Sequence, residues 1–238
     1  MFLAEAEGLE EILNTGSIQV PQPVCCGANE QISWLVLEYL DFGPAGGSSS
    51  ALLGEQLAAM HRFTALKFGW RRDNTIGSTP QVNTPTEDWI AFFRDHRLRY
   101  QLDLAATRGA AVDLLDSGAR LLEDISSLFG NYSPVASLLH GDLWGGNWGC
   151  DDQGQPVLFD PAVYYGDREA DLAMTELFGG FDDRFYQSYQ QSWAIDPGYS
   201  TRKVLYNLYH VLNHFNLFGG GYSRQAQGMI DTLLAEIS

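Results

Sequence analysis

The most constraining feature of the sequence is a glycine-rich segment between two short apolar runs in the second half of the chain. Residues 140–147 read His-Gly-Asp-Leu-Trp-Gly-Gly-Asn, and residues 135–139 and 157–159 are the apolar runs. Asp160 ends the second run, thirteen residues after Asn147. Such runs predict two short strands. A tight loop and a hairpin between them would bring Asp142, Asn147 and Asp160 to one point.

These three polar residues form a layout that phosphoryl transfer uses. In that layout an Asp accepts the proton of the acceptor hydroxyl, an Asn holds a metal ion, and a strand-end Asp bridges magnesium to the phosphates of ATP. A lone Asp beside glycine is usually a turn residue. Three polar positions at these offsets, flanked by two apolar runs, favour the chemical interpretation.

The sequence resembles the fructosamine (ketosamine) kinases, relatives of the aminoglycoside and choline kinases that have a protein-kinase-like fold. The resemblance covers essentially the whole chain. It includes residues 140–147, residues 160–169 and 171–174, and the stretch 73–77 with Trp89. Trp144 and the Asp-Asn-Thr-Ile-Gly stretch at 73–77 are the elements that distinguish fructosamine kinases from the wider superfamily.

The resemblance implies transfer of the γ-phosphate of ATP to the sugar 3-hydroxyl of a fructosamine, with ATP and Mg²⁺ as cofactors. The phosphorylated adduct is then unstable, which frees the amine from glycation. The implied site residues are the catalytic base Asp142, the metal ligands Asn147 and Asp160, the adenine-binding hinge Leu37, Glu38, Tyr39 and Leu40, and the helix glutamate Glu5, which pairs with a nucleotide-binding lysine.

Four other residues, Trp144, Asp73, Asn74 and Asp171, have two interpretations each. Trp144 either forms a wall against the substrate or braces the loop. Asp73 and Asn74 either make a turn, which their residue types favour, or contact the substrate, as the resemblance suggests. Asp171 either anchors the catalytic loop or is a solvated helix acid, and His140 is expected to support the site without touching the substrate.

Two histidines four residues apart, His210 and His214, could face one way on a helix, as zinc ligands sometimes do. No third ligand is evident, and apolar residues surround both histidines in the sequence. Packing histidines are therefore the favoured interpretation.

The elements predict an α+β chain with a small strand-containing N-terminal part and a mostly helical C-terminal part. The resemblance implies a protein-kinase-like fold with two lobes, a truncated N-lobe sheet and a largely helical C-lobe. Residues 1–40 are expected to be a partial nucleotide lobe with a helix at 2–13 and a largely buried strand at 32–40. Residues 41–50 have a linker composition, and residues 51–238 are expected to form the helical lobe. Thr84, Pro85 and Glu87 predict the start of one helix, and four helical segments are expected after Asp167.

The N-terminal part departs from the family pattern. Only four residues precede Glu5, and the first lysine is Lys67. Residues 43–48 are rich in glycine but lack the lysine of a phosphate-binding loop, so we interpret them as linker. The strands that carry the glycine-rich loop and the lysine are not in this sequence, and we expect the polypeptide as given to be an impaired kinase.

Composition excludes several classes of partner. Thirty acidic against fourteen basic residues give a net charge of −16, a field that repels nucleic acid and anionic membranes. Three cysteines without a CxxC pair, and no basic leader segment, predict a cytoplasmic protein. An exposed edge at residues 18–20 is expected to invite an oligomer or a strand-completing partner.

Two other functions fit the same residues. An aminoglycoside-type or choline-type small-molecule kinase shares the catalytic loop, and a substrate panel would separate it from a fructosamine kinase. A non-catalytic binding module derived from a kinase would retain the acceptor pocket without using ATP. The missing lysine favours the module, whereas the intact Asp142, Asn147 and Asp160 favour an enzyme.

Overall fold

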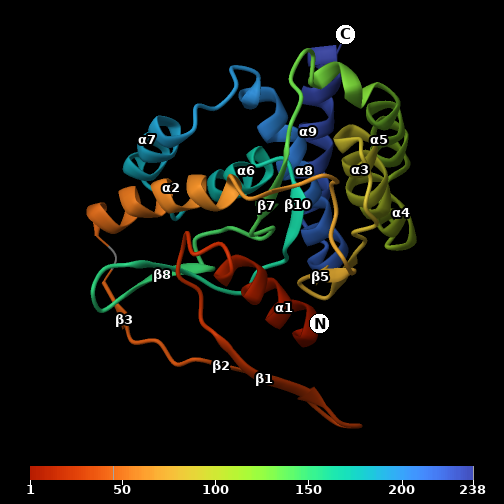
Figure 1. Cartoon of the computed structure of the whole chain (residues 1–238). Coiled ribbons are helices and arrows are strands. Elements are labelled where there is room, and N and C mark those ends of the chain that lie inside the picture. Colours follow the sequence, from red (N-terminus) through yellow and green to blue (C-terminus); the bar gives the residue numbers. More distant parts are fainter. Residues whose placement is uncertain (45, 238) are drawn as a thin grey trace.

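A computed structural model describes residues 1–44 and 46–237 (Figure 1). The described α-helices are α1 (Phe2–Leu13), α2 (Gly47–His61), α3 (Trp89–Phe93), α4 (Tyr100–Thr107), α5 (Val112–Asp124), α6 (Glu169–Leu177), α7 (Asp183–Ser192), α8 (Tyr199–Phe218) and α9 (Tyr222–Ile237). A π-helical segment, η1 (Arg94–Arg99), joins α3 to α4, and a 3₁₀ segment, η2 (Ile125–Leu128), follows α5.

The strands are short and form four small antiparallel sheets. Their order is β1–β2, β10–β7–β4, β3–β8–β9 and β5–β6. The strands are β1 (Pro23–Ala28), β2 (Ser33–Leu37), β3 (Phe42–Gly43), β4 (Thr64–Ala65), β5 (Asn74–Ile76), β6 (Thr79–Gln81), β7 (Ala136–Leu139), β8 (Trp148–Asp151), β9 (Pro156–Leu158) and β10 (Tyr164–Gly166).

The helices after Asp167 form the centre of the larger part of the molecule. Helix α8 packs against α4, α6 and α9, and α9 packs in turn against α5 (Figure 1). Helices α2 and α7 approach closely at Gly54, where a Cβ atom would collide with the carbonyl oxygen of Phe185. The four helical segments predicted after Asp167 are confirmed, with breaks at the glycines and proline that the sequence places between them.

Strand β7 leads directly into the glycine-rich segment. All four of its residues are buried, and it pairs with β10 on one side and β4 on the other. Strands β8 and β9 follow the segment and pair with each other from Trp148 to Pro156. The two predicted apolar runs are therefore strands, as expected, and the loop between β7 and β8 is held at both ends.

The N-terminal part consists of α1 and the β1–β2 hairpin, which extends away from the rest of the molecule (Figure 1). Helix α1 has the predicted bounds, and Arg71 and Arg72 hold it through ion pairs to Glu7 and Glu11. The prediction of a largely buried strand at 32–40 is wrong. Strand β2 ends at Leu37 and is mostly exposed, because β1 is its only paired strand among the described residues.

Two other local predictions are corrected. Residues 18–20 are not an exposed edge, because Ile18 and Val20 are buried and Gln19 forms a bridge to Val157. The helix that was expected to start at Thr84 starts at Trp89, with Asp88 accepting a hydrogen bond from the N–H of Ala91. The backbone before it is extended and bonds to the turn at residue 68 instead.

The predicted linker, residues 41–50, contains strand β3 and the first turn of α2. Residue 45 of this linker lies outside the described residues. Over the described ranges, no helix combines the length and the apolar character needed to span a membrane.

Candidate active site

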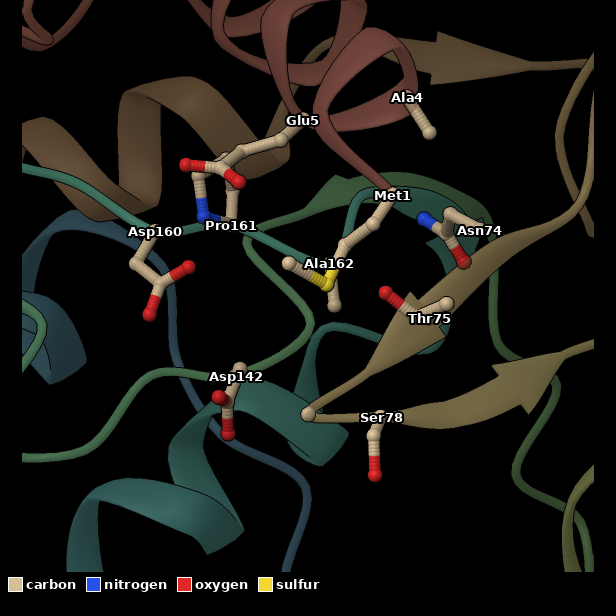
Figure 2. A pocket seen from close by; sticks show the side chains of 11 residues that line it. Met1, Ala4, Glu5, Asn74, Thr75, Ser78, Asp142, Asp160, Pro161 and Ala162 are labelled. Atoms are coloured by element: carbon tan, nitrogen blue, oxygen red, sulfur yellow. The ribbon is translucent and has the colours of Figure 1, made fainter. Parts of the chain in front are cut away.

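A cavity of about 360 Å³ lies where α1, the β5–β6 turn and the loops after β7 and β9 meet. Figure 2 shows Asp142 and Asp160 on one side of it, Glu5 from α1 above Asp160, and Thr75 and Ser78 across from them. The carboxylates of Glu5, Asp142 and Asp160 therefore surround one space, which we call the carboxylate cavity. The cavity also includes Met1, Ala4, Asn74, Gly77, Pro161 and Ala162.

Asn147 connects the two aspartates. Its Nδ2 donates to the backbone oxygen of Asp142 at 2.9 Å, and lies 3.4 Å from both the Asp142 carboxylate and the backbone oxygen of Asp160. The side chain is buried, with 4% of its surface exposed. The structure thus brings together the three residues that the sequence singled out.

His140 fixes the spacing between the loops that carry Asp142 and Asp160. Its Nε2 lies 3.0 Å from the carbonyl oxygen of Phe159, and its Nδ1 lies 3.3 Å from the backbone nitrogen of Asp142. A carbonyl oxygen only accepts hydrogen bonds, so Nε2 carries the proton and Nδ1 accepts. Burial lowers the pKa of this histidine and keeps it neutral.

Asp171 on α6 anchors the start of the same loop. Its carboxylate accepts hydrogen bonds from the backbone N–H groups of His140 (2.7 Å) and Gly141 (2.8 Å), and lies 3.2 Å from Nε2 of His61. Burial by itself would raise the pKa of Asp171. The bonds from His61 and the backbone stabilise the charged form more strongly, and hold the pKa below its usual range.

Gly141 and Asp160 of the site have left-handed backbone conformations. Gly141 has φ +83°, and a Cβ atom there would collide with the carbonyl oxygen of Ala162, so only glycine fits. Asp160 has φ +56° and is the only non-glycine residue with positive φ in the described ranges. Strain of this kind persists where the surrounding structure imposes it, commonly at functional sites.

The carboxylates repel one another in a partly buried space. Burial, followed by the charges of Asp160 and Asp171, raises the pKa of Asp142 to about 7. Burial and then Asp160 raise the pKa of Glu5 to about 6. No lysine or arginine forms an ion pair with Glu5 in the described part of the chain, and the only two lysines, Lys67 and Lys203, pair with other glutamates.

We therefore expect Asp142 of the metal-free protein to titrate near pH 7. Its folded pKa lies above the ordinary Asp value, so its contribution to stability is lost as pH rises from about 4 through 7. Binding of Mg²⁺ should shift the titration to lower pH, because a cation favours the carboxylate. Carboxyl ¹³C shifts, assigned by comparison with Asp142→Asn, measure both effects. A pKa below 5 without metal would contradict the expectation.

A second cavity, of about 590 Å³, is lined by all four predicted hinge residues, and we call it the hinge cavity. Leu37, Glu38, Tyr39 and Leu40 line it together with Pro21, Asp41, Phe42 and Phe159. Phe159 directly precedes Asp160, so this apolar cavity adjoins the carboxylate cavity. The volume of this cavity is large enough for the purine base of a nucleotide.

A third cavity, of about 370 Å³, lies on the other side of Asp142. We call it the aromatic cavity, because half of its twelve described lining residues carry rings: Trp144, Phe178, His210, His214, Phe218 and Tyr222. Gly77 and Asp142 line both this cavity and the carboxylate cavity. Asp142 therefore lies at the junction of the two cavities.

Trp144 both braces the loop and lines the aromatic cavity. A Cβ atom on Gly146 would collide with the indole ring, so the ring lies across the backbone of Gly146. Even so, 41% of Trp144 is exposed. The two interpretations of this residue are therefore compatible.

Asp73 and Asn74 hold the wall of the carboxylate cavity. Asp73 accepts a hydrogen bond from the backbone N–H of Asn83, and the Nδ2 of Asn74 donates to the carbonyl oxygen of Val163. The Oδ1 of Asn74 accepts from Gln81 and Asn83. These bonds engage both side chains within the protein, although Asn74 also lines the cavity.

The donor groups fit magnesium and a nucleotide. Mg²⁺ prefers oxygen ligands and is usually held by one or two carboxylates plus phosphate oxygens. Asp160, which lines the carboxylate cavity, would supply a carboxylate, and Asn147, whose Nδ2 lies 3.4 Å from the backbone oxygen of Asp160, would supply an amide oxygen. No group of three or more His, Cys, Asp or Glu placed to hold a metal occurs in residues 1–44 and 46–237.

Sequence reasoning missed His61, Tyr222 and the role of α8 in the site. His61 is the last residue of α2, and nothing in its local sequence links it to Asp171, which lies 110 residues later. His210 and His214 were recognised as a pair on one helix face, but their place in a cavity next to Asp142 depends on how α8 packs.

Comparison with solved structures shows the fold class of the protein. The fold matches that of a choline/ethanolamine kinase family protein from Mesorhizobium loti, with a TM-score of 0.60 and 15% sequence identity over 100% of this chain and 79% of that one. The described structure thus has a kinase-like fold that it shares with that protein and with the aminoglycoside phosphotransferase APH(2")-IIa (TM-score 0.58, 13% identity), with a helical C-terminal part.

Closer matches define the family. The family model for fructosamine kinase matches residues 1–236. A "Probable ketoamine kinase" of Synechocystis sp. is 51% identical over 98% of this chain and 79% of its own length. A chloroplastic "Protein-ribulosamine 3-kinase" of Oryza sativa subsp. indica is 45% identical over 98% of this chain and 69% of its own length.

A solved structure agrees with these relatives. The crystal structure of a "putative fructosamine-3-kinase" from Thermobifida fusca has a TM-score of 0.90 and 34% identity, and the match covers 99% of this chain and 80% of that one. This chain belongs to the fructosamine kinase family, whose members are phosphotransferases acting on sugar hydroxyl groups.

Proposed function

We propose that the protein transfers the γ-phosphate of ATP to the 3-hydroxyl of a ketosamine sugar. The observation that carries the proposal is that Asp142 lines both the carboxylate cavity and the aromatic cavity. A base at this junction can accept a proton from an acceptor hydroxyl on one side while the phosphoryl group arrives from the other. The relatives named ketoamine kinase and ribulosamine 3-kinase support the choice of acceptor.

Each residue then has a separate task. Asp142 accepts the proton of the 3-hydroxyl, and Asn147 and Asp160 hold Mg²⁺. The hinge cavity binds adenine, while His140 and Asp171 keep the loop in place. When bound, Mg²⁺ supplies positive charge against the phosphates. We divide the chain accordingly into a nucleotide-binding part at 1–40, a linker at 41–50 and the acceptor-binding part at 51–238.

The expected rate depends on the environment of Glu5, which forms no ion pair with a lysine or arginine in the described part of the chain. Glu5 and Asp160 face one cavity with a raised Glu5 pKa, and no described lysine or arginine offsets their repulsion. This field opposes the phosphates of ATP. We therefore expect the 238-residue polypeptide to turn over below about 1 s⁻¹, under the usual range for kinases.

An assay with ATP, Mg²⁺ and a fructosyl amine tests the proposal. Release of ADP gives the rate, and ³¹P NMR of the product identifies a sugar 3-phosphate. Aminoglycosides and choline serve as alternative acceptors in the same assay. Turnover within the usual kinase range would contradict the expected impairment but support the function.

Titration with ADP, with and without Mg²⁺, separates an enzyme from a binding module. We expect Mg²⁺ to tighten ADP binding, and Asp160→Asn to remove that difference. A protein that binds fructosyl amines but neither ADP nor ATP would be a binding module. A protein that phosphorylates only aminoglycosides or choline would contradict the proposed acceptor.

A further inference from the structure

The aromatic cavity has an unusual combination of walls. It is lined by six rings, counting the two histidines, and Asp142 is its only acidic residue. No lysine or arginine is among its lining residues in the described part of the chain. An apolar space with one carboxylate at its inner end has the polarity of a site for an organic cation.

His210 adds no positive charge to the aromatic cavity. Burial, and then the neighbouring His214, lower the pKa of His210 to about 3, so His210 is neutral at physiological pH. The Nδ1 of His214 donates to the carbonyl oxygen of His210 at 2.7 Å, which leaves Nε2 without a hydrogen-bond partner in the described part of the chain. The ring of His214 packs among Phe178 (5.0 Å), Tyr222 (5.2 Å) and Phe218 (5.6 Å).

We propose that the aromatic cavity binds the amine end of the ketosamine as a cation and selects against amine substituents that carry a carboxylate. This inference rests on the proposed function, because it assumes that the acceptor is a ketosamine. The secondary amine of a ketosamine is protonated near neutral pH, and aromatic faces attract such a cation. With the amine among the rings, the adjoining sugar lies toward Asp142, where its hydroxyl must react.

The selection against carboxylate-bearing substituents follows from the absence of lysine and arginine among the described lining residues. A carboxylate next to the amine would enter an apolar space with no lysine or arginine among its described lining residues and with Asp142 nearby. Burying such a charge without a partner is costly. Ketosamines formed from apolar amines, or from lysine side chains whose carboxylate is distant or in an amide, meet no such cost.

A matched pair of ligands tests the selection. Fructosyl-phenethylamine and fructosyl-phenylalanine differ only by the carboxylate, and the methyl ester of fructosyl-phenylalanine masks that charge. We expect calorimetry, with and without MgADP, to give at least about tenfold tighter binding of the phenethylamine derivative than of the phenylalanine derivative. The ester should bind nearly as tightly as the phenethylamine derivative.

Charge placed at the cavity should change the preference. Phe218 lines the aromatic cavity and is 69% exposed, so Phe218→Lys should fold and bring the two affinities within about threefold of each other. Val112, on α5, has the same 69% exposure but does not line the cavity. Val112→Lys is therefore the control and should leave the preference unchanged.

A ring deletion gives an independent result. Phe178→Leu keeps an apolar side chain but removes the ring, and should weaken binding of the phenethylamine derivative about threefold to tenfold. Phe63→Leu, outside the cavity, should not change it. The inference is overturned if the two ligands bind equally or if Phe218→Lys and Val112→Lys behave alike, even while both ligands are phosphorylated. If neither ligand is bound or phosphorylated, the proposed function itself fails.

Discussion

Replacing Asp142 with Asn is expected to slow phosphoryl transfer to a fructosyl amine by about 10²–10⁴-fold, the range for loss of a general base. Asn keeps the size of the side chain but cannot accept the proton. A single-turnover assay, with protein in excess over labelled ATP, measures the rate even where steady-state turnover is slow. Binding of the fructosyl amine should change much less than the rate.

The same substitution should make the protein more stable above pH 7. Ionised Asp142 lies in a buried position beside Asp160 and Asp171, which is why its pKa is raised. Asn removes that repulsion, so the melting temperature at pH 8 should rise while activity falls. Asp116, exposed on α5, provides the control, because Asp116→Asn should change neither property. A rate loss under tenfold would show that Asp142 is not the base.

The second large effect concerns stability and centres on Arg202. Its guanidinium bonds to both carboxylate oxygens of Glu169 (2.7 and 3.0 Å) and to Asp196 (2.8 Å), and lies over the ring of Tyr132 at 3.8 Å. The side chains of Arg202 and Glu169 are 2% and 0% exposed. Buried Asp167 lies close by, and its charge contributes to the raised pKa of Glu169.

Arg202→Met is expected to lower the free energy of unfolding by about 3–5 kcal/mol, because it leaves Glu169 buried without its cation. Urea denaturation at pH 7.5 measures the change. Lys203→Met is the matched control on the same helix. Lys203 pairs with Glu176 at the surface, so its loss should cost less than about 1 kcal/mol.

A double variant separates the buried charge from lost packing. Arg202→Met with Glu169→Met replaces both partners by apolar side chains, and should recover most of the loss. A loss under about 1.5 kcal/mol in Arg202→Met alone would show that the pair does not hold α6 to α8. Because α6 carries Asp171, we also expect weaker anchoring of the catalytic loop in the single variant.

Much of the local structure could be predicted because it depends on neighbouring residues. The amphipathic pattern of residues 2–13 was enough to place α1, and glycine and proline mark the breaks between the last four helices. Predictions from the local sequence were wrong where hydrogen bonds to residues distant in the sequence determined the backbone conformation. Thr84 has the sequence of a helix cap, yet the extended backbone that follows it pairs with residue 68, and Asp88 caps the helix instead.

The candidate site divides in the same way. Asp142, Asn147 and Asp160 were recognisable because a loop and a hairpin of fixed length bring them together. Asp73 and Asn74 gave an ambiguous signal, since the bonds that engage them come from Asn83, Gln81 and Val163. His61 gave no signal, because its contact with Asp171 joins two helices that are distant in sequence.

The sequence by itself therefore determined the family and the residues of the candidate reacting centre, because both depend on residue types at short, fixed spacings. Only the tertiary structure decided what surrounds that centre. It placed Glu5 beside Asp160 without a basic partner, and it brought Trp144, Phe178, His214 and Tyr222 around one cavity next to Asp142. Charge repulsion and apolar burial act through space, so the raised pKa values and the shape of the acceptor cavity depend on how the helices pack.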